Sequence, residues 1–250
     1  MNKSANTSIA LKVAIGILVF CSSIGNLWAA ESDYRLEKAY TKITDIESLR
    51  RGALIFAQNC VACHSAQYMR YSRIGEDLEW SNDELRKNMG ITGSVFDTIK
   101  SPLSAEAAAA AYGIEPPDLS LRAKVRGLDW MLTYIKGFYS DEQSSTGFNN
   151  VVYPDTAMSN VLAAMQGIQE PVYEEVHGEQ KLVGLKITAP GLMTRKEFHN
   201  AMTDLVNFMD YISEPAKLQR VQLGWKVMLF LLLLIFLTYL VKREYWKDLA

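Results

Sequence analysis

Cys60, Cys63 and His64 are the residues of this 250-residue chain whose types and spacing most clearly predict a chemistry. They form the run Cys-Val-Ala-Cys-His, the attachment signature of a c-type haem. On a helix, the two cysteines would lie on one face about one turn apart, so their sulfurs could form thioethers with both vinyl groups of one porphyrin. The imidazole of His64 could hold the iron from the proximal side. We therefore predict one covalently attached haem c.

Three other interpretations of the cysteine pair are weaker. A structural zinc site needs two further Cys or His ligands, and the chain offers only Cys21, His177 and His199, none of them paired. A thioredoxin-like pair needs a βαβ setting, whereas the flanking sequence predicts helix. A structural disulfide or a chance occurrence is the third alternative. Haem attachment accounts best for the pair and the histidine that follows it.

The second axial ligand is predicted to be a methionine, because Met raises the potential of a c-type haem. Such a ligand should lie on a constrained loop downstream of the attachment site. Residues 141–161 lack helical periodicity until their end and contain glycine, asparagine and proline, which predicts a loop. Met158 lies in this loop and is the best candidate. Met165 and Met193 are weaker candidates.

A predicted helix over 45–64 carries the attachment site. Its apolar residues recur at steps of three and four and form one stripe. These residues are Leu49, Ala53, Phe56, Ala57 and Cys60. Thr44 or Ser48 could cap its start. Gly52 lowers helix propensity by about 1 kcal/mol relative to alanine, and we hypothesise that it lets another helix cross closely.

Further periodic segments predict a mainly α fold. Short helices are expected over 80–88 and 104–113, and 128–139 is expected to be a helix that faces the core. The aromatic residues of 128–139 are interpreted as packing rather than as redox groups. Residues 68–71, which are aromatic and basic, could either wall the haem or form solvated surface.

The C-terminal half adds a hairpin and a long helix. Alternation of apolar and polar residues over 172–187 predicts a β-hairpin with His177 in its turn. Thr194 and Glu197 match a capping box that opens a helix with one apolar stripe. Met202 and Met209 belong to that stripe and are expected in the core. His199 lies beside the stripe and is expected to be exposed.

The N-terminus predicts export. Residues 1–29 have a positive start, an apolar stretch and a small-residue end, as in a signal peptide. An uncleaved anchor is the alternative, because the apolar stretch is only slightly too short to span a membrane. The formal net charge of −2 gives no support to a nucleic-acid partner.

A second apolar run, 221–241, reaches the length of about 20 residues that a transmembrane helix needs. Trp225 and Tyr239 lie near its ends, where aromatic belts form. A buried core helix is the alternative. Haem attachment in bacteria takes place outside the cytoplasmic membrane. We therefore predict a single-pass protein of the cell inner membrane, with a haem-binding domain over 30–215 on the periplasmic side and a cytoplasmic tail over 242–250.

The haem motif and further segments along the chain resemble one family, proteobacterial cytochrome c1. They occur in the same order and the likeness extends over 45–250. The segments are residues 49–52, 60–65, 68–71, 116–121, 129–139, 146–154 and 246–248.

The resemblance implies a class I c-type cytochrome domain with inserted loops and a small β-hairpin, followed by one transmembrane helix. It implies the haem subunit of ubiquinol–cytochrome c oxidoreductase, the cytochrome bc1 complex. Cytochrome b and a Rieske iron–sulfur protein would be its partners in a dimeric complex. The Rieske protein would pass one electron to this haem, and a cytochrome c would accept it. No side chain is expected to act as acid, base or nucleophile, so the isolated chain is not expected to be catalytic.

Carried over by motif, Met158 is the distal ligand opposite His64, and Lys124 and Arg126 contact the haem propionates. Two positions depart from the family pattern. Ser159 stands where proline usually follows the axial methionine, and Lys124 stands where arginine is usual. Lysine lacks the bidentate contact that arginine makes with a carboxylate. A looser propionate contact is therefore expected at Lys124. At Ser159, a less constrained loop is expected to loosen the bond between iron and sulfur and to lower the haem potential.

Two other functions share these features. A membrane-tethered cytochrome c shuttle would use the same site without fixed partners, but a minimal domain of this kind needs only about 100 residues. An anchored binding or assembly module would have no redox role and no covalent haem.

Overall fold

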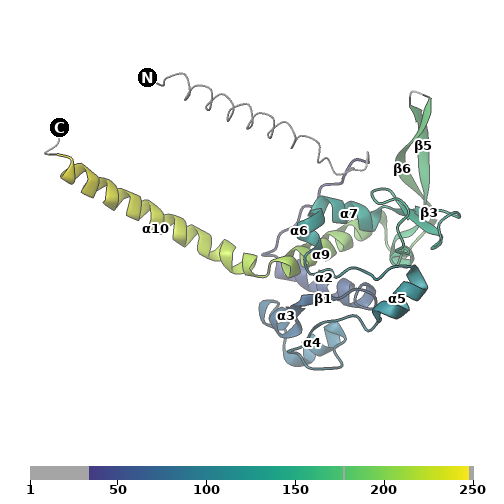
Figure 1. The fold of residues 1–250 in the computed structure, drawn as a ribbon, viewed down its shortest axis with the longest axis horizontal. Helices are drawn as coiled ribbons and strands as arrows, with labels where there is room; N and C mark the ends of the chain where they lie inside the picture. Colours follow the sequence, from purple (N-terminus) through teal and green to yellow (C-terminus); the bar gives the residue numbers. More distant parts are fainter. Residues whose placement is uncertain (1–33, 177, 248–250) are drawn as a thin grey trace, which may run out of the picture. The chain divides into compact units, whose positions relative to one another are not determined.

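The computed structural model describes residues 34–176 and 178–247, which form a mainly helical fold with small two-stranded sheets, as predicted (Figure 1). The helices are α2 (Ile46–Asn59), α3 (Tyr71–Asp77), α4 (Asn82–Met89), α5 (Ala105–Tyr112), α6 (Arg122–Arg126), α7 (Leu128–Lys136), α8 (Ala163–Gln166), α9 (Arg195–Ser213) and α10 (Ala216–Tyr245). The strands are β1 (Ala66–Arg70), β2 (Thr98–Ile99), β3 (Phe138–Ser140), β4 (Phe148–Asn150), β5 (Gly167–Val176) and β6 (Glu179–Pro190). The predicted signal peptide over 1–29 lies outside the described residues, as do His177 and residues 248–250.

Helices α2 and α9 pack against each other in the main core (Figure 1). On α2, Leu49, Ala53 and Phe56 are fully buried. A Cβ atom on Gly52 would lie 2.1 Å from the backbone oxygen of Asp204 on α9, closer than any side chain can approach. The close crossing that we hypothesised for Gly52 is therefore present, and it explains why a residue of low helix propensity lies in this helix.

Capping side chains determine where several of the helices begin. Thr194 opens α9 with the predicted capping box, and Ser104 caps α5. The start of α2 differs from the prediction, because Asp45 is its N-cap and neither Thr44 nor Ser48 is. The Asp45 carboxylate accepts a hydrogen bond from the backbone N–H of Ser48 at 3.0 Å. A carboxylate is favoured here because it also complements the positive end of the helix dipole.

The sheets are hairpin-like pairs. The predicted hairpin is present and longer than predicted, since β5 and β6 pair antiparallel from Gly167 opposite Pro190 to Val176 opposite Glu179. The predicted helix over 128–139 ends at Lys136, and its last residues enter β3 instead. This strand pairs with β4, which lies inside the segment predicted as a loop. The loop prediction was therefore wrong for 148–150.

The N-terminal described segment is tied to α7 and α9 by polar contacts. Asp129 accepts hydrogen bonds from the backbone N–H of Ala39 at 2.9 Å and from a lysine ammonium. The Nδ1 atom of His199 lies 3.0 Å from a Glu37 carboxylate oxygen and 3.0 Å from the Lys136 ammonium nitrogen, and Glu37 and Lys136 also pair with each other. His199 is therefore half-buried and partnered, not exposed as predicted.

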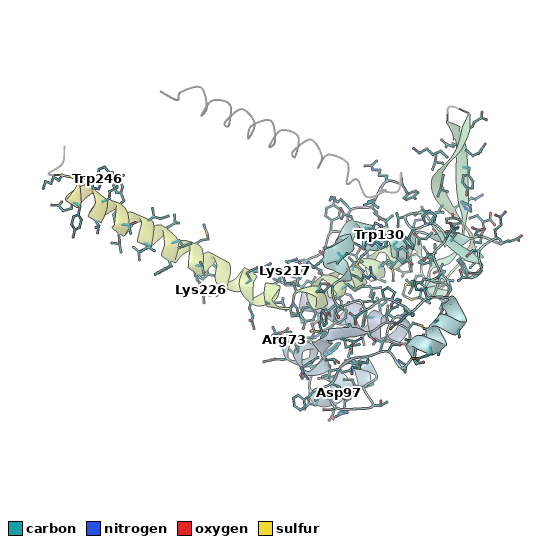
Figure 2. The ribbon with its side chains drawn as sticks, in the orientation of Figure 1. Arg73, Asp97, Trp130, Lys217, Lys226 and Trp246 are labelled. Atoms are coloured by element: carbon teal, nitrogen blue, oxygen red, sulfur yellow. The ribbon has the colours of Figure 1, made fainter. Side chains whose placement is uncertain are left out.

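Helix α10 carries the predicted membrane segment. Its stretch Leu223–Tyr245 has 23 residues and a mean hydropathy of 2.2, and none of its most apolar window is buried by the described chain. Lys226 and Trp246 mark the two ends of this stretch (Figure 2). A core helix of a soluble domain would be mostly covered, so the exposed apolar surface fits a membrane anchor.

Candidate haem-binding site

The cysteine–histidine run lies in a turn directly after α2. The helix ends at Asn59, and Cys60 is its C-cap. The backbone N–H groups of Cys63 and His64 both donate to the Cys60 carbonyl oxygen, at 3.1 and 2.8 Å. The expected helical position of this run was therefore wrong. These two hydrogen bonds nevertheless close one turn, which keeps the three functional residues together.

The cysteine sulfurs lie in an environment that suits a neutral sulfur. Cys60 and Cys63 are free and half-buried, and Cys60 packs against the main core. Burial raises the pKa of the Cys60 thiol to about 12, and the nearby Cys63 adds to the rise. A thiol that stays protonated at neutral pH is a poor nucleophile and a poor zinc ligand. This environment favours an uncharged thioether over a redox or zinc thiolate.

His64 is oriented by a backbone carbonyl. Its Nδ1 atom lies 2.8 Å from the carbonyl oxygen of Pro117, to which it donates as N–H. The neutral ring then keeps its lone pair on Nε2, the atom that would face a metal. Burial lowers the pKa of His64, while the bond to Pro117 opposes part of that shift. A neutral imidazole with a fixed tautomer is what a haem iron requires.

The segment that holds Pro117 is itself fixed to β1. The Asp118 carboxylate accepts from the backbone N–H of Gln67 at 2.9 Å and from that of Ser120 at 2.8 Å. The N–H of Leu119 donates to the Ser65 carbonyl at 2.7 Å. Asp118 does not cap the following helix, because α6 begins after Leu121 without a side-chain cap. Its carboxylate instead connects the Pro117 turn to the strand that follows His64.

Residues 68–71 are divided between core and surface. Met69 and Tyr71 are buried, whereas Tyr68 is 76% exposed. Tyr68 lines a hollow of about 270 Å³ together with Asp118 and Leu121, beside the segment that holds His64. The buried pair is structural, whereas Tyr68 and Arg70 are exposed, and only Tyr68 of the four residues lines this hollow.

Met158 lies in the predicted loop and is held by side chains from α7. The Tyr134 hydroxyl lies 3.5 Å from the Met158 sulfur and 3.0 Å from the Thr156 hydroxyl. The side-chain amide of Asn150 donates to the Tyr134 carbonyl at 2.8 Å, and its oxygen accepts from the backbone N–H of Val152 at 3.1 Å. The loop that carries Met158 is thus constrained, as a ligand loop must be.

Helix α7 carries two aromatic rings that pack against both apolar clusters of the described chain. The rings of Trp130, labelled in Figure 2, and Tyr134 stack with their centroids 4.9 Å apart and their planes at 9°. Both rings pack against the main core, on which Cys60 also packs, and against a smaller apolar cluster that contains Val151 and Val152. The main core and the smaller cluster therefore meet at these two rings.

The two predicted propionate residues have protein partners. Lys124 pairs with Glu214 at 2.6 Å and lies 3.8 Å from the buried Asp210, both at the end of α9. The Arg126 guanidinium lies over the rings of Trp130 and Tyr153, 4.9 and 5.8 Å from their centroids. The Arg126 guanidinium thus lies against these two aromatic rings, whereas the Lys124 ammonium is directed to the end of α9.

Sequence reasoning missed three groups of this site. The Pro117 carbonyl carries no residue-type signal, because every residue has a carbonyl. The Tyr134 hydroxyl could have been suspected from its helical spacing to Trp130, and the Thr156 hydroxyl from its place two residues before Met158. The alternative methionines, Met165 and Met193, pack against the main core. The donor set of two thiols, an imidazole with a fixed tautomer and a constrained thioether fits one c-type haem.

Comparison with known proteins gives a consistent result. Residues 36–249 match the model of the Cytochrome C1 family. The chain is 40% identical over 227 residues to cytochrome c1 of Allochromatium vinosum, covering 89% of this chain and 93% of that protein. It is 40% identical over 217 residues to a protein of Nitrosomonas europaea named ammonia monooxygenase gamma subunit, covering 86% and 89%. It is 25% identical over 244 residues to a Bradyrhizobium diazoefficiens protein named cytochrome b/c1, covering 82% of this chain and 34% of that protein.

Proposed function

Because this chain belongs to the cytochrome c1 family, and so is the haem-bearing electron-transfer subunit of a bc1 complex, we propose that it accepts one electron from the Rieske iron–sulfur protein and passes it to a cytochrome c. The observation that carries the proposal is the hydrogen bond from His64 to the Pro117 carbonyl. This bond leaves Nε2 of a neutral imidazole free for iron. His64 also directly follows two cysteines whose spacing suits attachment to one porphyrin.

Each site residue has one proposed role. Cys60 and Cys63 attach the haem, His64 is the proximal ligand, and Met158 is the distal one. Proteins of this family carry one covalently bound c-type haem, which supplies one-electron redox chemistry. Arg126 is proposed to contact a propionate from its position over Trp130.

Lys124 is proposed to reach the second propionate from the last turn of α6. It would do so while sharing its charge with Glu214, which already pairs with it. This divided role is consistent with the looser contact expected of a lysine at this position.

The chain itself contributes binding, orientation and exclusion of water. Burial around Cys60, the fixed tautomer of His64 and the constrained loop of Met158 set the environment in which electrons are exchanged. Ligand type, burial and hydrogen bonds are the factors by which a protein tunes such a potential. The proposed role requires no proton transfer by a side chain.

The chain is a membrane-anchored subunit, and the further details of its location are proposed. We propose the cell inner membrane, with α10 as a single pass, residues 30–215 on the periplasmic side and 242–250 in the cytoplasm. Lys242 and Arg243 in the last turn of α10 are compatible with that orientation. Cytochrome b is the proposed partner of the helix, since one relative is named cytochrome b/c1 and is much longer than this chain. A dimeric complex is proposed with it.

Purification in mild detergent through a C-terminal tag tests the proposal. Co-purification of b-type haem and an iron–sulfur protein, together with quinol-dependent cytochrome c reduction, is expected. Covalent haem on a denaturing gel is expected for the native chain and not for the matched Cys60→Ser/Cys63→Ser variant. If the chain with its c-type haem purifies without other subunits in mild detergent, a tethered shuttle would be favoured. If the native chain carries no covalent haem, an assembly module would be favoured.

The relative named ammonia monooxygenase gamma subunit suggests a second candidate function, a subunit of a monooxygenase. The same preparation separates the two candidates. Ammonia-dependent oxygen uptake without quinol-dependent cytochrome c reduction would favour the monooxygenase, and the reverse result is expected.

A further inference from the structure

We propose that Tyr134 is a positioning residue for the axial methionine, whose hydroxyl donates a hydrogen bond to the Met158 sulfur and thereby weakens that sulfur as a donor to iron. The proposal rests on the proposed function, because it requires Met158 to be the distal ligand. It adds a residue that sets the haem potential without touching the iron.

The Tyr134 ring has little freedom to move. It lies on α7, stacks on Trp130 at 4.9 Å and meets the edge of Phe138 at 5.2 Å and 70°. The backbone carbonyl of the same residue accepts from the buried Asn150 at 2.8 Å. Both the ring and the backbone of Tyr134 are therefore fixed relative to the loop that carries Met158.

The hydrogen-bond directions follow from the donor inventory. The Met158 sulfur has no proton, so in the 3.5 Å contact the Tyr134 hydroxyl must be the donor. The Thr156 hydroxyl, 3.0 Å away, can then donate to the Tyr134 oxygen. The Thr156 oxygen accepts in turn from the backbone N–H of Met158 at 3.4 Å. The three groups form a closed chain in which each proton has one acceptor, and each hydrogen bond strengthens the next.

The chemistry of the sulfur gives this contact a consequence. A thioether sulfur has two lone pairs, one for a metal and one for a hydrogen bond. Withdrawal of electron density by the hydroxyl makes the sulfur a weaker donor, which disfavours ferric iron more than ferrous iron. The hydrogen bond is therefore expected to raise the haem potential.

The test is the Tyr134→Phe variant of the full chain, purified in its complex. This change keeps the stacked ring and removes only the hydroxyl. The matched control is Tyr139→Phe, which also removes a hydroxyl from a buried tyrosine, one that packs in the smaller apolar cluster with Val151 and Val152. We expect a lower midpoint potential for Tyr134→Phe than for the native protein and the control. We also expect a displaced thioether-to-iron charge-transfer absorption in the ferric state.

Equal potentials in Tyr134→Phe and Tyr139→Phe would overturn the inference. Thr156→Val provides a second test if Tyr134→Phe does not fold. It removes the hydroxyl that donates to the Tyr134 oxygen, and it should lower the haem potential by less than Tyr134→Phe does. Thr156→Ser keeps a hydroxyl and should leave the haem potential unchanged. No shift in Thr156→Val would then overturn the inference.

The Met158→Leu variant tests the assignment of Met158 as a ligand separately from the inference about Tyr134. If Met158→Leu abolishes the charge-transfer absorption while Tyr134→Phe leaves the potential unchanged, the ligand assignment stands and the Tyr134 inference fails. If Met158→Leu leaves the ferric spectrum as it was, the ligand assignment fails first, and the Tyr134 inference fails with it.

Discussion

The two sides of the haem site are built in different ways. The attachment side follows a regular helix, and its position is set by the close crossing of α2 and α9, where Leu49 and Phe56 are fully buried. The methionine side is an irregular segment positioned by side-chain hydrogen bonds from Asn150, Tyr134 and Thr156. One side depends on apolar packing, and the other depends on a small number of directed polar contacts.

This difference suggests a division of tasks. Covalent attachment requires a site that does not move relative to the core, and close-packed helices provide that rigidity. The distal ligand requires an adjustable bond, because its strength sets the potential, and a loop held by a few hydrogen bonds can be tuned one residue at a time. Three changes would test this comparison, from the largest expected effect to the smallest.

Gly52→Val should have the largest effect. Its Cβ would lie 2.1 Å from the Asp204 backbone oxygen, so α2 and α9 would have to separate. We expect a loss of about 3 kcal/mol or more in unfolding free energy, measured by thermal unfolding of the detergent-solubilised holoprotein. Gly184→Val is the matched control, since a Cβ there meets no described atom within 4 Å. Native stability in Gly52→Val would show that the crossing is not what fixes the attachment side.

Asn150→Ala should affect the methionine side alone. It leaves the Val152 N–H without its partner and the Tyr134 carbonyl with only the Gly137 N–H, at a cost of about 1–3 kcal/mol. Haem should stay covalently bound, because the attachment side is unchanged, while the thioether-to-iron absorption weakens. Asn82→Ala on the exposed start of α4 is the control, with an expected change within about 0.5 kcal/mol. Loss of covalent haem in Asn150→Ala would show that the two sides are not independent.

Asp129→Asn should have the smallest effect, and that effect should disappear at low pH. The hydrogen bond from the Ala39 backbone N–H, followed by the one from Lys38, holds the pKa of Asp129 below its ordinary value of 3.8. The ionised carboxylate thus stabilises the fold above pH 3.8, and this contribution is lost as the pH falls through the lower, folded-state pKa. The acid unfolding midpoints of the native chain and Asp129→Asn measure it.

The native chain should be more stable than Asp129→Asn above pH 3.8, and the difference should shrink as the pH falls below that value. Asp83→Asn on the exposed surface of α4 is the control and should follow the native profile. If the difference in stability between the native chain and Asp129→Asn stays constant down to the acid midpoint, the stabilising role of the ionised Asp129 carboxylate would be contradicted.

The features that the sequence predicted correctly depend on neighbours in the chain. The capping box at Thr194, the stripe of α9 and the apolar span of α10 each arise from contacts within about four residues or from composition, so spacing alone reveals them. The spacing of Cys60, Cys63 and His64 belongs to the same class. The choice of Asp45 over Thr44 and Ser48 as the cap of α2 was missed because three residues within five positions were all suitable by type.

The tertiary structure decided the features that join distant residues. His64 and Pro117 are 53 positions apart, and Tyr134 and Met158 are 24 apart. Lys124 pairs with Glu214 because α6 packs on the end of α9, which no local pattern encodes. A backbone carbonyl has no residue-type signature, and the direction of a side chain is fixed only when helices pack. The sequence by itself therefore determined that this protein attaches a haem and carries an apolar span, whereas packing decided which groups orient the histidine and hold the methionine.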